Sequence, residues 1–328
     1  MALPPSILIR TAKTIWTTLW RTMMSQMAPS DKEGAYQRPK SAFCDRVPSK
    51  QFPAAAQRYR LIVGMGCPWA HRTLIVHTLK GLNAAIPVTV VSPSGNEGCW
   101  IFDHPSEAES LGCRTMPQFY AKVQTRYAGR ATVPVLWDSQ TNTIVNNESA
   151  EIIEILNNGF NHWATQPDLD LAPVKLQPEI EQWNEHIYRT VNNGVYRCGF
   201  AQTQTAYETA CNELFQTLDA IDTQLANQRY LCGRQLTLAD VRLFTTLIRF
   251  DVAYYNLFKC NRRRIADYPN LSGYVRDIYQ LPAIARTCDV DAIKRDYFGN
   301  LFPLNPGGII PLGPNLESLE MPHRRETL

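Results

Sequence analysis

The residue of this 328-residue chain best placed to be reactive is Cys67, in the stretch GMGCPWAHR (64–72). The apolar run 59–63 ends at Gly64, which is typical of a buried strand, and Pro68 suits the first turn of a helix. Cys67 is therefore expected at a helix N-terminus, where free backbone N–H groups and the helix dipole lower the pKa of a thiol. The pattern predicts a nucleophilic thiolate. The alternative is a buried cysteine that serves as a small apolar side chain.

No second cysteine stands close to Cys67. Ala70 occupies the position where a dithiol oxidoreductase has its resolving cysteine. A mixed disulfide on Cys67 must then be released by an external thiol, and the abundant intracellular thiol is glutathione. The pattern predicts glutathione as a co-substrate.

The remaining cysteines and histidines give no sign of a metal site or a disulfide framework. The nine cysteines are odd in number, irregularly spaced and never in a CxxC pair, and the six histidines are scattered. Such usage in a long chain argues against secreted, disulfide-stapled folds and against zinc binding. We expect no metal and a reducing, cytoplasmic location.

Composition and charge exclude two further classes. The chain is 45% apolar without a continuous apolar run long enough to span a bilayer, so no transmembrane segment is expected. The formal net charge is only +3, and the basic run 259–264 (KCNRRR) lacks the interleaved aromatic residues of a nucleic-acid surface. We interpret that run as a solvated helix end and expect no nucleic-acid partner.

The first 30 residues differ from the rest. Three cations occur before the first acidic residue, Asp31, and apolar residues recur at helical spacing: Trp16, Leu19, Trp20, Met23, Met24 and Met27. Three interpretations stay open. The segment is a transit peptide, which would place the protein in an organelle, a helix on a membrane surface, or an arm that packs on a neighbour or is disordered.

The elements around Cys67 follow the order of a thioredoxin unit. A helix is expected after the first strand, then a second strand, an irregular excursion, a hairpin and another helix. The expected ranges are 69–80 for the helix, 86–91 for the strand, 92–130 for the excursion, and 132–137 with 143–145 for the hairpin, before a helical pattern at 152–156.

The second half of the chain reads as helical. A linker with two prolines at 160–175 precedes apolar residues at helical spacing, and Thr237 with Asp240 forms a capping-box pattern. Helices are expected near 177–193, 204–227, 238–255, 270–280 and 289–296. The predicted fold is an α/β thioredoxin-like N-terminal domain plus an all-α C-terminal domain. The predicted segments are an N-terminal arm or targeting segment 1–34, the thioredoxin-like domain 35–160, the helical domain 176–298 and an irregular tail 299–328.

Two features of the thioredoxin-like unit suit a bound tripeptide. Val133-Pro134 predicts a cis peptide bond, which turns the preceding backbone outward so that it pairs with a peptide as an extra strand. Glu148 and Ser149 open the next helix, where N–H groups and the hydroxyl suit the carboxylate of a γ-glutamyl group. The alternative for this pair is an ordinary helix cap.

Taken together, these stretches resemble the cysteine-containing glutathione transferases, and more closely the glutathionyl-hydroquinone reductases, or Xi class. The similarity runs from about residue 34 to 314 and implies a glutathione transferase fold and a homodimer. The matching stretches are GAYQRPKSAF, CPWAHRTLIVHTLKGL (67–82), GRATVPVLWDSQTNTIVNNESAEII (129–153), NNGVYRCGFAQTQTAYE (192–208), LADVRLFTTLIRFDVAYYNLFKCN (238–261) and NPGGIIPLGP (305–314).

The resemblance also implies roles for single residues. Cys67 matches the nucleophile and Tyr196 the tyrosine that donates and accepts the substrate proton, while Tyr254 and Tyr297 match phenols that line the site and help to keep the cysteine ionised. Read without the resemblance, each tyrosine is equally an aromatic packing residue. The residues that match glutathione contacts are Trp100, Arg130, Ala131, Thr132, Val133, Glu148 and Ser149. Cys99 stands between Gly98 and Trp100, where the family has glycine directly before the tryptophan.

The implied reaction is the reduction of glutathionylated hydroquinones. Cys67 attacks the sulfur, Tyr196 acts as general acid and base at the ring carbon, and a second glutathione releases the Cys67–glutathione disulfide. The alternatives are an omega-like thiol-transferase or dehydroascorbate reductase and a non-enzymatic module that binds glutathione conjugates. A conjugating transferase is disfavoured, because a reactive thiolate would form a disulfide with glutathione instead of activating it.

Overall fold

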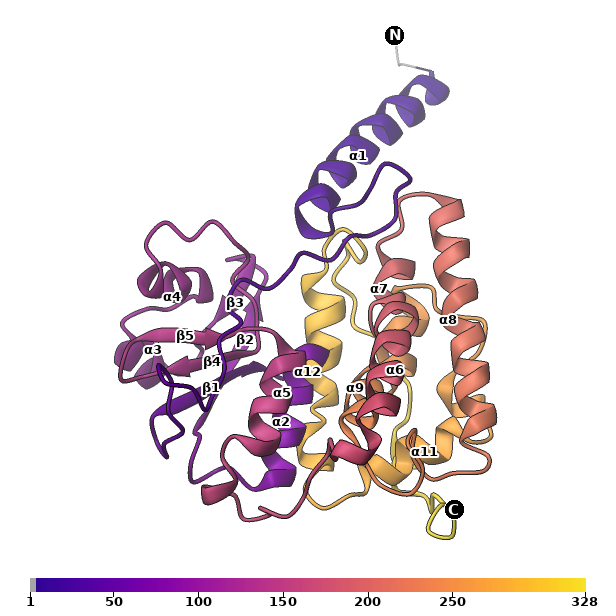
Figure 1. Ribbon diagram of the computed structural model, residues 1–328. Helices are drawn as coiled ribbons and strands as arrows, with labels where there is room; N and C mark the ends of the chain where they lie inside the picture. The colour runs from indigo at the N-terminus through magenta and orange to yellow at the C-terminus, as the bar shows by residue number, and fades with distance from the viewer. Residues whose placement is uncertain (1–3) are drawn as a thin grey trace.

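The structure, a computed structural model, describes residues 4–328. A five-stranded sheet and its helices form one half, and a bundle of helices forms the other (Figure 1). The strand order is β3-β2-β1-β4-β5, with β1 parallel to β2 and antiparallel to β4. The strands are β1 (Tyr59–Gly64), β2 (Val88–Ser94), β3 (Cys99–Ile101), β4 (Val135–Asp138) and β5 (Thr143–Asn146).

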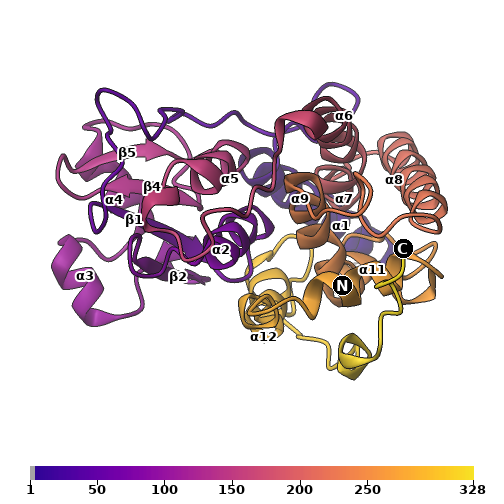
Figure 2. The ribbon, with the colours of Figure 1, turned by 60° about the horizontal axis from the view of Figure 1, so that its bottom comes forward.

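Two helices of the α/β half lie between the sheet and the bundle. They are α2 (Pro68–Lys80) and α5 (Ser149–Asn158), which pack against each other, while α2 also contacts α9 of the bundle (Figure 1, Figure 2). The strand, helix, strand, hairpin and helix expected from the sequence are therefore confirmed. The Val133–Pro134 bond is cis, as predicted.

The excursion 92–130 is the main error of the sequence-based assignment. It holds β3 and two short helices, α3 (Pro105–Leu111) and α4 (Met116–Val123). Both helices have proline in their first turn. Thr115 and Gln118 cap the N-terminus of α4 with a reciprocal capping box. These elements are too short for a clear hydrophobic period, so their prolines look like loop signals in the sequence.

The bundle contains the predicted helices, several of them interrupted. Three five-residue π-helical segments break them, at Tyr188–Asn192, Phe250–Tyr254 and Arg295–Gly299. Two of these segments carry Tyr254 and Tyr297, and π-turns of this kind often occur at functional sites. The helices are α6 (Gln177–Ile187), α7 (Gly194–Gly199), α8 (Gln204–Gln224), α9 (Leu238–Arg249), α10 (Tyr255–Leu257), α11 (Leu271–Tyr279) and α12 (Val290–Lys294). Short 3₁₀ turns lie at Asn161–Trp163, Val174–Leu176, Ile265–Asp267, Ala285–Thr287 and Glu317–Glu320.

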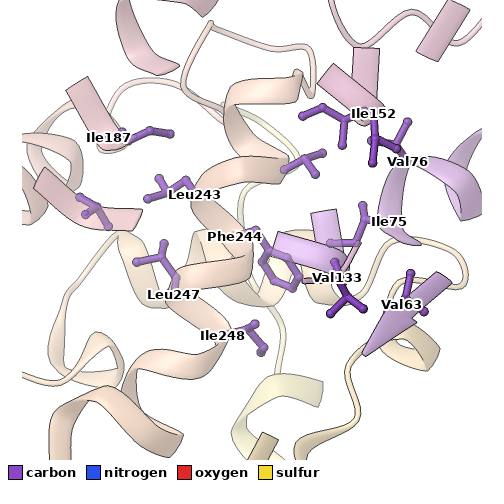
Figure 3. Packing of buried hydrophobic residues seen from close by; sticks show 14 of the residues in the cluster. Val63, Ile75, Val76, Val133, Ile152, Ile187, Leu243, Phe244, Leu247 and Ile248 are labelled. Carbon is purple, nitrogen blue, oxygen red and sulfur yellow. The ribbon is translucent and has the colours of Figure 1, made fainter. Parts of the chain in front are cut away.

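One continuous hydrophobic core joins the two halves. Figure 3 shows Ile75 of α2 close to Phe244 of α9, and Val76 of α2 beside Ile152 of α5. All four side chains are fully buried. The start of α9 is held by Asp240, whose carboxylate accepts the backbone N–H groups of Thr237 and Leu231. The shared core keeps the N-terminus of α2 at a constant position relative to the bundle.

The first helix, α1 (Pro5–Met27), projects away from both halves (Figure 1). Only its last turns contact the body. Met24 is fully buried, and the indole N–H of Trp20 donates to the carbonyl of Pro303 at 3.1 Å. The helical spacing predicted for this segment is confirmed. Within residues 4–328, no helix combines the length and apolar character needed to cross a membrane.

Candidate active site

A pocket of about 470 Å³ lies where the α/β half meets the bundle. Most of the residues expected at the site line it, and they come from stretches far apart in the sequence: Cys67, Trp100, Arg130, Thr132, Val133, Glu148, Ser149, Tyr196 and Tyr297. Two expected residues are not among the lining residues. Ala131 lies beside the pocket in a partly buried position, and Tyr254 is fully buried behind Tyr297.

Cys67 is the N-cap residue of α2, as the strand–glycine–cysteine–proline pattern predicts. Its side chain is partly exposed at the pocket. The sulfur lies 3.7 Å from the carbonyl oxygen of Val133, to which the thiol donates. Because Val133 precedes the cis-proline, its carbonyl is the backbone group that faces the nucleophile.

The predicted depression of the Cys67 pKa is wrong for the protein without a ligand. Burial raises the pKa of this thiol, although the N–H of Ala70, the Arg249 guanidinium, the N–H of Trp69 and the Arg38 guanidinium all act to lower it. The loss of hydration on burial destabilises the thiolate by more than these four groups stabilise it. The resting form is therefore a thiol hydrogen-bonded to Val133, with donors in place for the anion that forms when the proton leaves.

Three tyrosine hydroxyls form a chain that ends in the pocket. The hydroxyl of Tyr297 lies 2.6 Å from that of Tyr196 and 2.9 Å from that of Tyr254. Burial raises the pKa of Tyr254 to about 12 and the pKa values of the other two well above the ordinary value. All three are neutral phenols at physiological pH, able to donate a proton and to take one from the next hydroxyl in the chain.

The ring of Tyr196 is held by aromatic packing. It stacks on Trp69 with centroids 6.2 Å apart and contacts Phe258 at 5.4 Å. Two guanidinium groups also lie against the Trp69 ring, those of Arg38 at 3.8 Å and Arg72 at 4.3 Å from its centroid. These stacked cations fix the indole and add positive charge beside the pocket.

Glu148 is the N-cap residue of α5 and also lines the pocket, so the predicted helix cap is confirmed and the glutathione contact stays a prediction. Its carboxylate caps α5 by accepting the N–H of Ala150 at 3.1 Å, and it also accepts the hydroxyl of Ser41 at 2.8 Å. It lines the pocket together with Ser149, whose hydroxyl accepts from Arg72 at 3.4 Å. The pocket therefore offers one carboxylate and one hydroxyl at the N-terminus of α5.

Trp100 lies in the pocket in spite of Cys99 before it. The indole packs directly on β1, and a Cβ atom added to Gly64 would lie 2.4 Å from the Trp100 ring. Gly64 is thus a position of close approach, where only glycine leaves room for the tryptophan.

Comparison with known proteins places this architecture in a family. Residues 66–158 match the model of the glutathione S-transferase N-terminal domain, and residues 204–277 match that of the C-terminal domain. Glutathionyl-hydroquinone reductase YqjG of Escherichia coli (strain K12) is 45% identical over 306 residues, which cover 89% of this chain and 93% of that protein. Glutathionyl-hydroquinone reductase PcpF of Sphingobium chlorophenolicum is also 45% identical, over 78% of this chain and 83% of that protein.

The chain belongs to the Xi class of glutathione transferases. The crystal structure of the glutathione-S-transferase Xi from Phanerochaete chrysosporium superposes with a TM-score of 0.84 at 45% identity, covering 89% of this chain and 96% of that one. The glutathione-bound structure of YqjG gives a TM-score of 0.80 at 44% identity, covering 89% and 93%. The predicted thioredoxin-like plus helical fold is therefore confirmed.

One residue of this Xi-class site that the sequence did not indicate is Arg249. Its fully buried guanidinium donates to the carbonyls of Gly66 at 2.9 Å and Met65 at 3.0 Å, directly before the nucleophile. It also donates to Nδ1 of His71 at 2.9 Å, and burial lowers the pKa of His71 well below the ordinary value. The imidazole is thus neutral, with its Nε2 proton directed to the hydroxyl of Thr287, 2.8 Å away. The sequence feature that could have indicated Arg249 is its position as a charged residue next to the apolar residues Leu247, Ile248 and Phe250.

The second such residue is Asp296, which lines the pocket beside Tyr297. Its carboxyl group is so close to Gly66 that an added Cβ there would lie 1.7 Å from Oδ2. Burial raises the pKa of Asp296 to about 7, against the opposing effect of Arg249. Oδ2 is buried without a hydrogen-bond partner among the described residues. No motif in the sequence singled out this position.

Proposed function

We propose that this chain reduces glutathionylated hydroquinones to hydroquinones, with glutathione as the reductant. The observation that carries the proposal is one pocket in which a single cysteine, without a resolving partner, lies with a chain of neutral phenols. The relatives named glutathionyl-hydroquinone reductases, at 45% identity over most of the chain, support the same activity. The cysteine accounts for thiol exchange, and the phenols account for proton transfer to a ring.

The pocket offers complementary groups for a glutathionyl moiety. The Glu148 carboxylate and the Ser149 hydroxyl would take the ammonium and carboxylate of the γ-glutamyl group at the N-terminus of α5. The outward-facing backbone of Val133, before the cis bond, would pair with the peptide backbone. Arg130, in the same lining, would lie towards the glycine carboxylate. Trp100 of β3, whose indole packs on Gly64 of β1, would complete this cradle for glutathione.

Displacement of the Cys67 proton is the step that starts the reaction. In the free protein the thiol donates to the Val133 carbonyl. A substrate N–H that pairs with this carbonyl would compete with the thiol for it. The thiolate would then be stabilised by the N–H groups of Trp69 and Ala70 and by Arg249. Substrate binding thus lowers the thiol pKa that burial raises in the free protein.

The two half-reactions balance in atoms and protons. The thiolate attacks the sulfur of the glutathionyl-hydroquinone, an S–S bond forms, and the bond from sulfur to the ring carbon breaks. The ring carbon takes one proton from Tyr196, Tyr297 and Tyr254 share the charge left on the phenol chain, and the proton released by the Cys67 thiol restores that chain. Because one proton leaves the Cys67 thiol and one arrives on the ring, no net proton is exchanged with solvent. A second glutathione then reduces the mixed disulfide and leaves as oxidised glutathione.

The decisive experiment follows hydroquinone release from a glutathionyl-hydroquinone in excess glutathione. The parent should turn over, and Cys67→Ser should not, while intact-mass measurement with limiting glutathione should show a glutathione adduct on the parent alone. Turnover by Cys67→Ser would overturn the proposal. A glutathione-conjugate-binding module would bind the substrate in both proteins and turn over neither.

The omega-like alternative is separated by Tyr196→Phe. A thiol-transferase needs Cys67 but no ring protonation, so exchange of a small mixed disulfide should persist in this variant. Hydroquinone release should fall by roughly 10² or more, the usual contribution of a positioned general acid. Equal loss of both activities would show that Tyr196 is needed for the shape of the pocket alone. The homodimer that the resemblance implies stays a prediction, which sedimentation velocity checks.

A further inference from the structure

The distal part of α1 exposes an apolar face that no other part of residues 4–328 covers. The face is made by side chains at positions 8, 9, 15, 16 and 19, which the 3.6-residue turn of an α-helix places along one side. Half or more of each of four of them is exposed, and Trp16 is 47% exposed: Leu8 52%, Ile9 67%, Ile15 56% and Leu19 53%. Because most exposed apolar side chains in folded proteins occur singly, a row of five along one helix marks an interaction surface.

The opposite side of α1 is basic and contains no acidic residue. Arg10 and Arg21 lie almost directly opposite the apolar face, among threonines, and Lys13 lies at its flank. All three cations are exposed, and none forms an ion pair with another residue of the described chain. Ile7, 49% exposed and one turn before Arg10, is the apolar exception on this side. The helix therefore has a continuous apolar side with a tryptophan and a side that carries its cations.

The body of the protein cannot cover this face itself. The last turns of α1 are fixed by the buried Met24 and by the hydrogen bond from Trp20 to Pro303. From that anchor the helix runs outward, so that its N-terminal part points away from both halves (Figure 1). The base of α1 is fixed and its apolar face remains free.

The charge pattern distinguishes between two possible partners. Two copies of α1 packed through their apolar faces would leave all six cations on the outer sides of the pair, with no acidic residue on either helix to pair with them. An anionic lipid surface instead attracts every one of these cations and accepts the apolar side chains and Trp16 at the level of its headgroups. The absence of acidic residues thus favours lipid over a second copy.

We propose that α1 is a membrane-surface anchor, which lies in the interface of an anionic bilayer with Leu8, Ile9, Ile15, Trp16 and Leu19 inserted. The helix lies parallel to the surface. Its cations stay at the headgroups while the apolar side chains enter the acyl boundary. Because Met27 at the end of α1 lines the active-site pocket, the anchored protein holds that pocket close to the membrane.

Co-sedimentation of the full chain with vesicles tests the anchor. The probes are vesicles of phosphatidylcholine alone and of phosphatidylcholine with about a third phosphatidylserine. The parent should bind the anionic vesicles on the order of tenfold more tightly than the neutral ones, with affinity falling as salt is raised. Equal binding to both, or no binding to the anionic vesicles, would overturn the proposal.

Matched variants separate the apolar and cationic contributions. Trp16→Glu should abolish vesicle binding. Val174→Glu, which places the same charged residue at an 88% exposed apolar position far from α1 in the sequence, should leave binding intact. Replacing Arg10, Lys13 and Arg21 by glutamine should remove the preference for anionic vesicles. None of these residues lies in the pocket, so hydroquinone release in solution should be unchanged and serves as the test of folding.

Light scattering after size-exclusion chromatography tests the competing partner. With α1 as a lipid anchor, Trp16→Glu and the parent should have the same mass in solution at every protein concentration. A concentration-dependent oligomer that Trp16→Glu disperses, together with no binding to anionic vesicles, would assign the face to a second copy and overturn the proposal.

Discussion

The Arg249 guanidinium donates to the carbonyl of Gly66, 2.9 Å away, and so holds the residue directly before the nucleophile. The same guanidinium is one of the groups that lower the Cys67 pKa. A fully buried cation thus both shapes the turn before α2 and stabilises the charge that must form on the sulfur. Removing it should therefore change two properties, the stability of the fold and the pKa of the Cys67 thiol.

Arg249→Leu should lower stability and raise the Cys67 pKa further. The change leaves the buried carbonyl of Gly66 without its donor, which costs about 1–3 kcal/mol, and the partly buried carbonyl of Met65 loses its donor as well. The pH dependence of Cys67 alkylation should shift to higher pH, and hydroquinone release should fall with it. Arg249→Lys keeps the charge but not the fork of donors, so it should restore the thiol pKa better than the stability.

The control for this pair is Arg286→Leu, which removes an exposed arginine of the same bundle. It should change neither property. An alkylation profile of Arg249→Leu that matches the parent would show that the guanidinium acts on the turn alone and not on the sulfur.

Tyr254→Phe tests the far end of the phenol chain. Tyr254 does not line the pocket and reaches it only through its 2.9 Å hydrogen bond to Tyr297. Removing its hydroxyl should cost about 1 kcal/mol of stability and slow hydroquinone release less than Tyr196→Phe does. The ranking is measured by single-turnover release, with the partly exposed Tyr255→Phe as control. A larger loss in Tyr254→Phe than in Tyr196→Phe would contradict the proton path through Tyr297.

Asp296→Asn should change how stability depends on pH. The folded-state pKa of about 7 lies above the ordinary value of 3.8, so between these values the folded protein holds a proton that the unfolded chain has released. Stability contributed by this proton is present in full at low pH and is lost as pH rises through about 7. The parent should therefore lose more stability between pH 5 and pH 8 than the variant, by urea unfolding.

Asp291→Asn, on an exposed turn of α12, is the matched control and should retain the slope of the parent. Identical slopes for the parent and Asp296→Asn would show that Asp296 is ionised throughout this range. The comparison uses differences between variants, so titrations elsewhere in the chain cancel.

How much of the site was predictable depends on how local its determinants are. Cys67 at a helix start, the cis bond at Val133–Pro134 and the cap at Glu148 each follow from a few consecutive residues, and the structure has all three. Arg249 acts on Gly66, 183 residues away in the chain, which no local pattern can indicate. The direction of the Cys67 pKa shift was wrong for a related reason. The helix start is a local feature, but the burial that outweighs it is produced by the packing of the bundle on the α/β half.

Gly64→Ala should weaken glutathione binding with little effect on Cys67 itself. The new methyl group would lie 2.4 Å from the ring of Trp100, so the indole must move out of its place in the cradle. The dissociation constant for glutathione, measured by calorimetry on the Cys67→Ser background to prevent disulfide formation, should rise about tenfold or more, as expected when a binding side chain is displaced. Gly299→Ala is the control, because an added Cβ there meets no atom within 4 Å. If Gly64→Ala bound glutathione as tightly as this control, Trp100 would have no part in the cradle, and its assignment from the family resemblance would be withdrawn.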